Sequence, residues 1–346
     1  MNRRTFLDVM CVGGLAPFRL QTVFARARHP ARLVFVWLRR GLDGLAAVVP
    51  YGDPAYLASR GSLAYETSKL VRLGPLFGLS PGLAPLRELW DRDELVVLQA
   101  MAIPYRTRSH FEAQAVLESG TDHPDTPADG WVNRLVRVMS GQRSGIAIAS
   151  GMLRSLSGGP DVQGLSSIRS DTDRGDRTAI APLMQAVARI MCAADGPIVA
   201  AMEFGGWDTH ANQGIQGGAL DRRLRQLADG LLALRSAMGP VWKNTTVVVM
   251  TEFGRTVRSN GARGTDHGTA GAGFLLGPTL ARSAVHADWP GLKRQTLFED
   301  RDVRPTLDTR AVLKTALAGT FDLTRAQLDS VFPGSTTVRA CTHLMA

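Results

Sequence analysis

The chain has 346 residues, of which 45% are hydrophobic and 21% are charged, as in a folded globular protein with a large core. Its formal net charge is +9, but only four basic residues are lysines and no basic stripe is interleaved with aromatic residues, so nucleic acid is not an expected partner. No stretch approaches the roughly 20 consecutive apolar residues of a transmembrane helix.

The first 27 residues resemble a twin-arginine export signal. Asn2-Arg3-Arg4-Thr5-Phe6-Leu7 carries the paired arginines, an apolar stretch follows from Val9 to Phe18, and Ala25-Arg26-Ala27 offers a small-x-small cleavage site. We therefore expect residues 1–27 to be removed after passage through the twin-arginine export machinery, and residues 28–346 to fold as one domain. The mature protein would be periplasmic or secreted. Its remaining positive charge weakly favours anionic substrates.

Apolar runs and capping signals alternate along the rest of the chain. Buried strands are expected at 33–38, 95–100, 198–202, 245–250 and 273–276. Helices are expected at 81–90, 109–118, 130–139, 181–193, 220–238, 309–318 and 324–331. The strongest amphipathic pattern has one apolar face formed by Leu220, Leu224, Leu227, Leu231, Leu234 and Met238.

Alternating strands and helices predict an α/β fold, a three-layer α/β/α sandwich with a mainly parallel sheet. The segment 151–176 is rich in Gly, Ser and Asp and is expected to form a long surface excursion or lid. No clear linker divides the chain into two domains.

Polar motifs follow two of the expected strands. Gly205-Gly206-Trp207-Asp208-Thr209-His210 comes after the strand at 198–202. Thr251-Glu252-Phe253-Gly254-Arg255-Thr256, with Gly264-Thr265-Asp266-His267-Gly268 shortly behind it, comes after the strand at 245–250. Because the carboxyl ends of parallel strands meet at one edge of a sheet, these side chains are expected to lie together.

Carboxylates and imidazoles gathered from several segments are suited to a divalent metal. Zinc is the metal expected, and magnesium, manganese and calcium are the alternatives. The ligand candidates are Asp43, Asp208, His210, Glu252, Asp266 and His267.

The spacing of these residues suggests different roles. Asp208 and His210 lie two apart, so they point the same way in an extended segment. Asp266 and His267 are adjacent, so one can bind the metal while the other orients a ligand from outside. Asp43 lies in a Gly-rich turn, where a lone Asp is usually a turn residue.

Ser109 is the candidate nucleophile, since it follows an expected strand and opens a helix whose first amide groups favour an anion. Arg106 and Arg108 stand nearby to hold anionic oxygens. Arg255 is expected to pair with a carboxylate or with substrate and to stabilise developing charge. A plain N-cap role is the alternative for Ser109, and His110 either faces the site or packs.

Gly78-Leu79-Ser80-Pro81-Gly82 matches the G-x-S-x-G pattern of hydrolase elbows. No β-branched strand precedes it, and Pro81 favours an N-cap, so no elbow is expected there. Cys192 and Cys341 allow one disulfide in an oxidising compartment, although the apolar helical run around Cys192 favours a buried free thiol.

These motifs together resemble the exported DUF1501 family, whose function is unknown. The resemblance covers nearly all of the mature chain, and the combination of motifs is specific. It is carried by Arg40-Gly41-Leu42-Asp43-Gly44-Leu45, Val49-Pro50-Tyr51-Gly52-Asp53, Ser109-His110-Phe111, Glu118-Ser119-Gly120, the segments 205–210 and 251–268 quoted above, and Phe332-Pro333-Gly334.

That family is grouped with the alkaline-phosphatase-like superfamily of phosphatases, sulfatases and phosphomutases. The resemblance therefore implies that fold and a metal-dependent hydrolase acting on a small anionic ester, a phosphate or a sulfate. It implies that Ser109 is the nucleophile and that Asp208, His210 and His267 form one metal site. It also places Asp43 and Glu252 together at a second site.

The chain departs from the superfamily at two points. Phe253 follows Glu252 where the superfamily commonly has an Asp-His pair, and the spacing Asp208-x-His210 is shorter than usual. One complete metal site is therefore expected rather than two. A non-catalytic envelope protein that keeps the fold and at most one structural metal is the alternative function.

Overall fold

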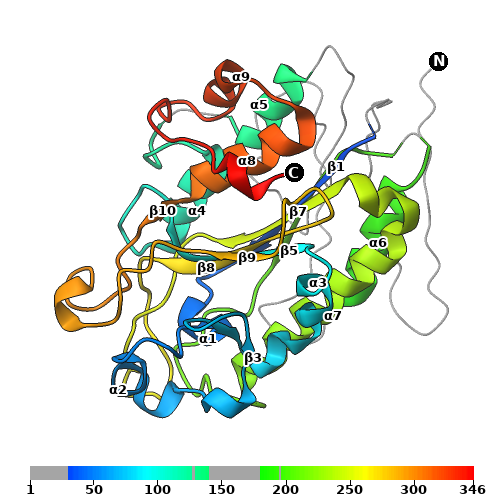
Figure 1. The fold of residues 1–346 in the computed structure, drawn as a ribbon. Helices are drawn as coiled ribbons and strands as arrows, with labels where there is room; N and C mark the ends of the chain where they lie inside the picture. Colours follow the sequence, from blue (N-terminus) through cyan, green and yellow to red (C-terminus); the bar gives the residue numbers. More distant parts are fainter. Residues whose placement is uncertain (1–29, 127–128, 140–179, 195) are drawn as a thin grey trace, which may run out of the picture.

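The computed structural model describes residues 30–126, 129–139, 180–194 and 196–346 (Figure 1). The expected export signal and the expected excursion at 151–176 lie outside the described residues. None of the described helices is long and apolar enough to cross a membrane.

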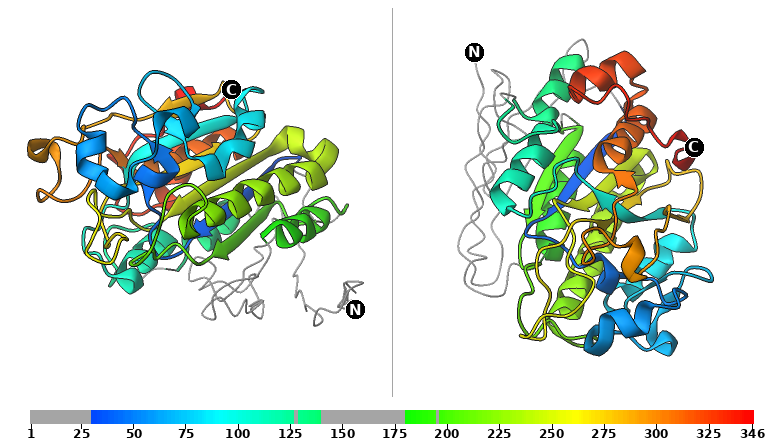
Figure 2. Two further views of the ribbon diagram at one scale, coloured as in Figure 1. Left: turned by 90° about the horizontal axis from the view of Figure 1, so that it is seen from below. Right: turned by 90° about the vertical axis from the view of Figure 1, so that its left-hand side faces the viewer.

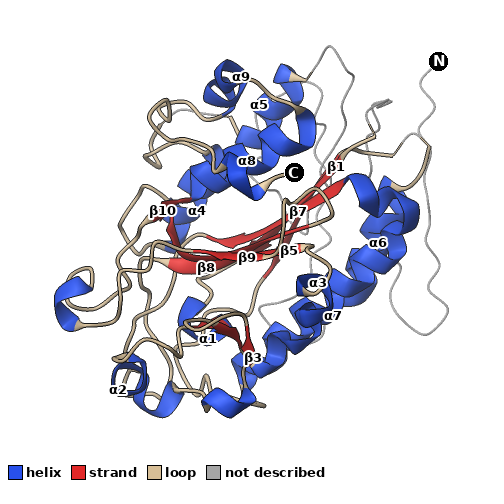
Figure 3. Ribbon diagram, in the orientation of Figure 1, coloured by secondary structure: helices blue, strands red, loops and turns tan. Residues whose placement is uncertain are grey.

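A seven-stranded sheet forms the centre of the molecule (Figure 3). Its strands are β1 (Arg32–Leu38), β5 (Leu95–Ala102), β6 (Val199–Phe204), β7 (Thr245–Thr251), β8 (Gly271–Leu276), β9 (Ala284–His286) and β10 (Leu307–Asp308). They follow the order β10-β5-β8-β7-β1-β6, with β9 paired to β5. All pairs are parallel except those of β8, which runs antiparallel to both β5 and β7. The expected mainly parallel sheet is confirmed.

Helices cover both faces of this sheet, which confirms the three-layer α/β/α architecture (Figures 1 and 2). One layer holds α3 (Arg87–Trp90), α6 (Ile180–Met191) and α7 (Ala219–Met238), and it faces the viewer in the left view of Figure 2. The other layer holds α4 (His110–Ser119), α5 (Trp131–Val138), α8 (Thr309–Phe321) and α9 (Arg325–Val331). A side chain caps the N-terminus of each of the last two helices: Asp308 caps α8, and Thr324 caps α9 in a capping box with Gln327.

Strand β1, which lies between β6 and β7, shows why the core has two halves. Its side chains alternate between the faces of the sheet, as the period of two requires. Val34 and Val36 join the cluster beneath α7, whereas Phe35 and Trp37 join the cluster around Trp131 of α5. Because both faces are covered, every residue of β1 is buried.

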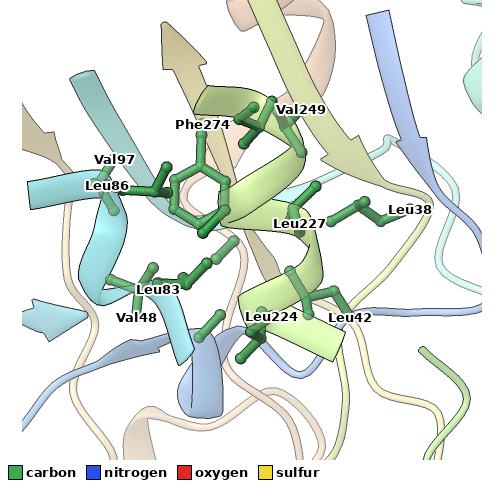
Figure 4. Close-up of a cluster of buried hydrophobic side chains, with 14 of the residues drawn as sticks. Leu38, Leu42, Val48, Leu83, Leu86, Val97, Leu224, Leu227, Val249 and Phe274 are labelled. Atoms are coloured by element: carbon green, nitrogen blue, oxygen red, sulfur yellow. The ribbon is translucent and has the colours of Figure 1, made fainter. Parts of the chain in front are cut away.

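The predicted apolar face of α7 is confirmed. In Figure 4, Leu224 and Leu227 of this helix pack toward Leu38, Val249 and Phe274 of the sheet region. The six residues of the predicted stripe are no more than 1% exposed: Leu220, Leu224, Leu227, Leu231, Leu234 and Met238.

Short elements between β1 and β5 escaped the sequence analysis. They are α1 (Gly44–Ala47), β2 (Val48–Val49), α2 (Tyr56–Arg60), β3 (Val71–Arg72) and β4 (Gly78–Leu79), and β2-β4-β3 form a small antiparallel sheet. Short 3₁₀ helices lie at Gly61–Leu63, Thr67–Lys69, Pro81–Leu86, Gly239–Asn244, Arg294–Thr296 and Thr342–Leu344.

The helix expected at 81–90 is a 3₁₀ helix in its first half and becomes α-helical only in α3. Pro85 has no N–H group to donate to the carbonyl of Pro81, so a regular α-helical turn cannot form there. Ser80 precedes this helix and is fully buried, which agrees with rejecting the hydrolase elbow. Cys192 and Cys341 are free thiols.

Candidate metal centre

The candidate centre lies where several strands end. Strands β1, β5, β6 and β7 run in one direction, so their carboxyl ends share one edge of the sheet. Leu38 at the end of β1 is paired with Phe204 of β6 and with Thr251 of β7. The loops that leave these strands therefore meet, as expected for an open α/β sheet.

Two of these loops are held together by their backbones. The buried Trp207 anchors the first loop by donating its indole N–H to the last residue of β6, at 2.8 Å. The N–H of Thr265 in the second loop donates to the carbonyl of Thr209 at 3.0 Å. At Gly264, a Cβ atom would lie 2.3 Å from the backbone carbon of His210, so only glycine permits this close approach.

Ligand atoms of Asp208, His210 and His267 form a small triangle. His210 Nε2 lies 3.0 Å from Asp208 Oδ1 and 2.9 Å from His267 Nε2. His267 Nε2 lies 3.2 Å from the same carboxylate oxygen. Ligands bound to one tetrahedral zinc ion at about 2.0–2.1 Å are themselves about 3.3 Å apart. The triangle is therefore close to the size that one zinc ion requires.

Outer hydrogen bonds fix the tautomers of both imidazoles. His210 Nδ1 faces Asp266 Oδ1 at 3.2 Å, and His267 Nδ1 faces the carbonyl oxygen of Arg108 at 3.0 Å. A carboxylate and a carbonyl only accept, so Nδ1 donates in each case, and each Nε2 can present a lone pair to a metal when the ring is neutral. Such outer acceptors are the usual partners of metal-binding histidines. Two lone pairs and a carboxylate oxygen thus converge, an arrangement that a cation between them would stabilise.

Asp208 is held in place and ionised by its neighbours. The buried Arg255 donates from Nη1 to Asp208 Oδ1 at 2.6 Å and from Nε to Thr265 Oγ1 at 3.2 Å. Burial alone would raise the pKa of Asp208, but His110, His267 and Arg255 outweigh it and lower that pKa far below its ordinary value. Of the two roles expected for Arg255, the structure shows the pairing with a carboxylate.

Asp43 lies at the same edge but is occupied by the protein itself. Its Oδ1 accepts from the N–H groups of Leu45 and Ala46, at 3.1 and 3.2 Å, and so caps α1. Its Oδ2 accepts from Arg60 Nη2 and Gln213 Nε2, both at 2.6 Å. The carboxylate is only 1% exposed.

A chain of hydrogen bonds connects Asp43 to Asp208. Gln213, which donates to Asp43, accepts from Thr265 Oγ1 at 2.9 Å. Thr265 Oγ1 accepts in turn from Arg255, which holds Asp208. Asp43 therefore contacts Asp208 only indirectly, through three intervening side chains.

Glu252 follows β7 and is buried beside the centre. Its Oε1 accepts from the N–H of Arg40 at 2.7 Å and from Gln114 Nε2 at 3.1 Å, and it faces His110 Nδ1 at 3.1 Å. Burial raises the pKa of Glu252, but the hydrogen bonds from His110 and Gln114 outweigh it and lower that pKa. Among the described residues, no hydrogen bond or ion pair joins Glu252 to Asp43.

His110, whose orientation the sequence left open, faces the centre. It begins α4, and its Nε2 lies 3.5 Å from Asp208 Oδ2. Its ring stacks on Phe253 with centroids 4.9 Å apart and meets the ring of His267 at 4.2 Å. Burial lowers the pKa of His110, but the carboxylates of Asp208 and Glu252 on either side raise it to about 9.

The contact of His110 and Gln114 with Glu252 was not predicted, although the sequence holds a signal for it. His110 and Gln114 are four residues apart on α4, so they share one face of the helix, and both reach Glu252 Oε1. Phe253 is the aromatic ring on which the His110 ring stacks.

Ser109 borders the centre. Arg108, the residue before it, accepts from His267 through its carbonyl oxygen, and the residue after it is His110. Ser109 occupies the N-cap position of α4, but its side chain makes no capping hydrogen bond. The alternative role as an N-cap therefore applies to its backbone alone.

The other candidate arginine is engaged elsewhere. Arg106 donates to the carbonyl of Ile103. Burial lowers the pKa of Arg106, and its charged neighbours are Asp308 and Arg310. Arg108 is bound by Glu299 at 2.5 Å and Asp302 at 2.8 Å. Among the described residues, Arg106 and Asp43 therefore make no hydrogen bond or ion pair with Asp208, His210 or His267. The side chains that the structure does bring together are those of His110, Asp208, His210, Glu252, Arg255, Asp266 and His267.

A family model described as a protein of unknown function (DUF1501) matches residues 167–332. This span contains the loops after β6 and β7, with Asp208, His210, Glu252, Asp266 and His267. The motifs around Asp43 and Ser109 lie outside it. A search among curated proteins gave no match.

Several solved structures are similar to the chain at low identity. The C-terminal periplasmic domain of EcEptC from Escherichia coli, in complex with Zn, is 10% identical over 73% of this chain and 76% of that one, with a TM-score of 0.42. The lipoteichoic acid synthase LtaP from Listeria monocytogenes is 11% identical over 78% and 69%, with a TM-score of 0.40. A candidate sulfatase from Bacteroides thetaiotaomicron is 8% identical over 73% and 66%, also at 0.40.

Proposed function

We propose that this chain is an exported metal-dependent hydrolase of small anionic esters, phosphates or sulfates. The observation that supports the proposal best is the convergence of His210 Nε2, His267 Nε2 and Asp208 Oδ1 within 2.9–3.2 Å, with both imidazoles held as Nδ1–H tautomers.

The donor set favours zinc. Imidazole nitrogens suit zinc, whereas magnesium, manganese and calcium prefer sites made of oxygen. Asp208, His210 and His267 would hold the ion, and Asp266 would orient His210 from outside. When bound, zinc supplies Lewis-acid polarisation of an ester oxygen.

The chain's own residues have separate tasks in this proposal. Arg255 holds the Asp208 carboxylate in one position, at 2.6 Å. Ser109 is the proposed nucleophile, because it borders the centre and its side chain does not cap α4. The first amide groups of α4 favour the anionic group of the substrate. Arg106 is not assigned a role in charge stabilisation, since its described partners lie elsewhere.

The remaining parts of the proposal concern location. Residues 1–27 are proposed as a twin-arginine signal that is removed, and residues 28–346 as one domain that works in the periplasm or outside the cell. Its partners would be the export machinery and a small anionic ester. Membership of the DUF1501 family, whose model matches residues 167–332, belongs to the same proposal.

The test is to purify the mature protein from an exporting host, measure bound metal, and assay aryl phosphate and aryl sulfate esters. We expect one zinc per chain in the wild type, lost in Asp208→Ala and His267→Ala. Hydrolysis that depends on the metal and falls in Ser109→Ala would support the nucleophile. Bound metal without hydrolysis would favour the non-catalytic envelope protein. A protein that binds no divalent metal would contradict the proposed hydrolase and leave the non-catalytic alternative.

A further inference from the structure

We propose that His110 is a third histidine ligand of this metal centre and that Glu252 orients it rather than binding the metal. The inference rests on the proposed function, because it concerns the same ion. It changes the expected ligand set, in which Glu252 was a ligand and His110 was unassigned.

The first argument is the tautomer of His110. Its Nδ1 faces Glu252 Oε1 at 3.1 Å, and a carboxylate oxygen only accepts. When a metal displaces the second proton of the ring, Nδ1 therefore keeps the proton that faces Glu252, and Nε2 presents the lone pair. That Nε2 is buried, has no hydrogen-bond partner among the described residues, and lies 3.5 Å from Asp208 Oδ2.

The second argument is that the same arrangement occurs three times. Each of three histidines gives Nδ1 to an outer oxygen, from Glu252, from Asp266 or from the carbonyl of Arg108. Each directs Nε2 toward the carboxylate of Asp208. The ligand atoms of His110, Asp208 and His267 all lie within 4.8 Å of one another, so one ion can reach them. Repeated outer acceptors of this kind are characteristic of metal-binding imidazoles.

The third argument is that both carboxylate oxygens of Glu252 already have hydrogen-bond partners within the protein. Its Oε1 receives the N–H of Arg40 and the amide of Gln114 in addition to facing His110, and its Oε2 receives the hydroxyl of Thr251. The side chain is only 1% exposed. Oε1 thus already has three partners, and the stacked Phe253 fixes the plane of the His110 imidazole.

Two measurements on the mature protein test the inference. X-ray absorption spectroscopy counts the imidazoles around bound zinc, and competition with a chromophoric chelator gives the zinc affinity. The wild type is expected to show three imidazoles. His110→Ala is expected to show two, with clearly weaker binding. Glu252→Gln, whose amide oxygen still accepts from Nδ1, is expected to keep three imidazoles with affinity lowered about 10- to 100-fold. His123→Ala removes an exposed histidine outside the centre and is the matched control, expected to match the wild type.

The outcomes separate the two proposals. Two imidazoles in the wild type, with no further loss in His110→Ala, would overturn this inference and leave the proposed metal centre of Asp208, His210 and His267 standing. A wild type that binds no zinc would overturn the proposed function itself. Since the wild-type spectrum alone decides the imidazole count, the test does not depend on whether a variant folds. Circular dichroism and thermal melting establish that the variants compared are folded.

Discussion

Asp43 and Asp208 follow neighbouring strands and reach the same edge of the sheet, yet their surroundings differ completely. Asp43 is 1% exposed and is neutralised by the guanidinium of Arg60 at 2.6 Å, with Gln213 at the same distance. Asp208 also has an arginine, Arg255, but imidazole nitrogens approach both of its oxygens.

The difference shows how one chain builds two kinds of carboxylate site, one buried and one partly exposed. Around Asp43 the protein supplies every donor, so the site is complete in the folded chain. Around Asp208 three imidazole nitrogens approach the carboxylate, so in the proposed centre a bound cation would take the place of the imidazole protons. We infer that the first carboxylate serves stability and the second serves binding, and the experiments below test that division.

The largest effect is expected from Arg60→Met, which removes the cation beside Asp43. The guanidinium is fully buried and also donates to the carbonyl of Val257 at 3.0 Å. Leaving one partner of a buried ion pair uncompensated costs about 3–5 kcal/mol. Urea denaturation of the metal-free protein measures the free energy of unfolding.

Arg225→Met is the matched control, because Arg225 pairs with Asp229 on the exposed side of α7. Removing an exposed pair of this kind costs less than about 1 kcal/mol. Equal losses in the two variants would contradict a structural role for the Arg60–Asp43 pair.

The next effect is on metal binding. Asp208→Asn keeps the size of the side chain but removes the charge between the histidines, so we expect zinc affinity to fall by more than about 100-fold, beyond the range of an outer-shell change. Asp43→Asn is expected to lower stability while zinc affinity stays within a few-fold of the wild type. Competition with a chelator measures both. Comparable zinc loss in the two variants would remove the distinction between the carboxylates.

Asp266→Ala tests the outer partner of one histidine. Asp266 accepts from His210 Nδ1 at 3.2 Å and is itself held by Asn260 at 3.0 Å. The Asn260 side chain lowers the pKa of Asp266, and His210 contributes, so the carboxylate is ionised at neutral pH. We expect zinc affinity about 10- to 100-fold lower, with the metal still bound by the same imidazoles. An unchanged affinity would show that the exposed Asp266 does not orient His210.

Much of the fold could be predicted from the sequence, because its signals are local. The six-residue apolar stripe of α7 and the β-branched run of β7 each decide an element by themselves. The direction of β8 could not be read from Gly271–Leu276, since an apolar strand looks the same in either orientation. Elements as short as α1 and β2 have too few residues to form a period.

The candidate centre could be predicted only in part from the sequence, for a related reason. Asp208, His210 and His267 stood out because they lie in Gly-rich segments after apolar strands. The engagement of Asp43 depends on Arg60 and Gln213, which carry no motif and meet it only through the fold. His110 was undecided because a helix start does not reveal which way its first side chain turns, and Glu252 and Phe253 settle that in space.

The smallest effect is a pH dependence of the metal-free protein. His110 has a pKa of about 9 in the folded chain, against an ordinary value of 6.5, because two carboxylates flank it. A raised pKa means that the protonated imidazole contributes stability fully below about pH 6.5, and that this contribution is lost as the pH rises through about 9. With chelator present, the difference in Tm between wild type and His110→Gln should be largest near pH 6 and shrink toward pH 10. The exposed His123→Gln should show no such trend. A difference that grows with pH would mean that Asp208 and Glu252 do not hold a proton on His110, and the contrast with the self-neutralised Asp43 would then need another cause.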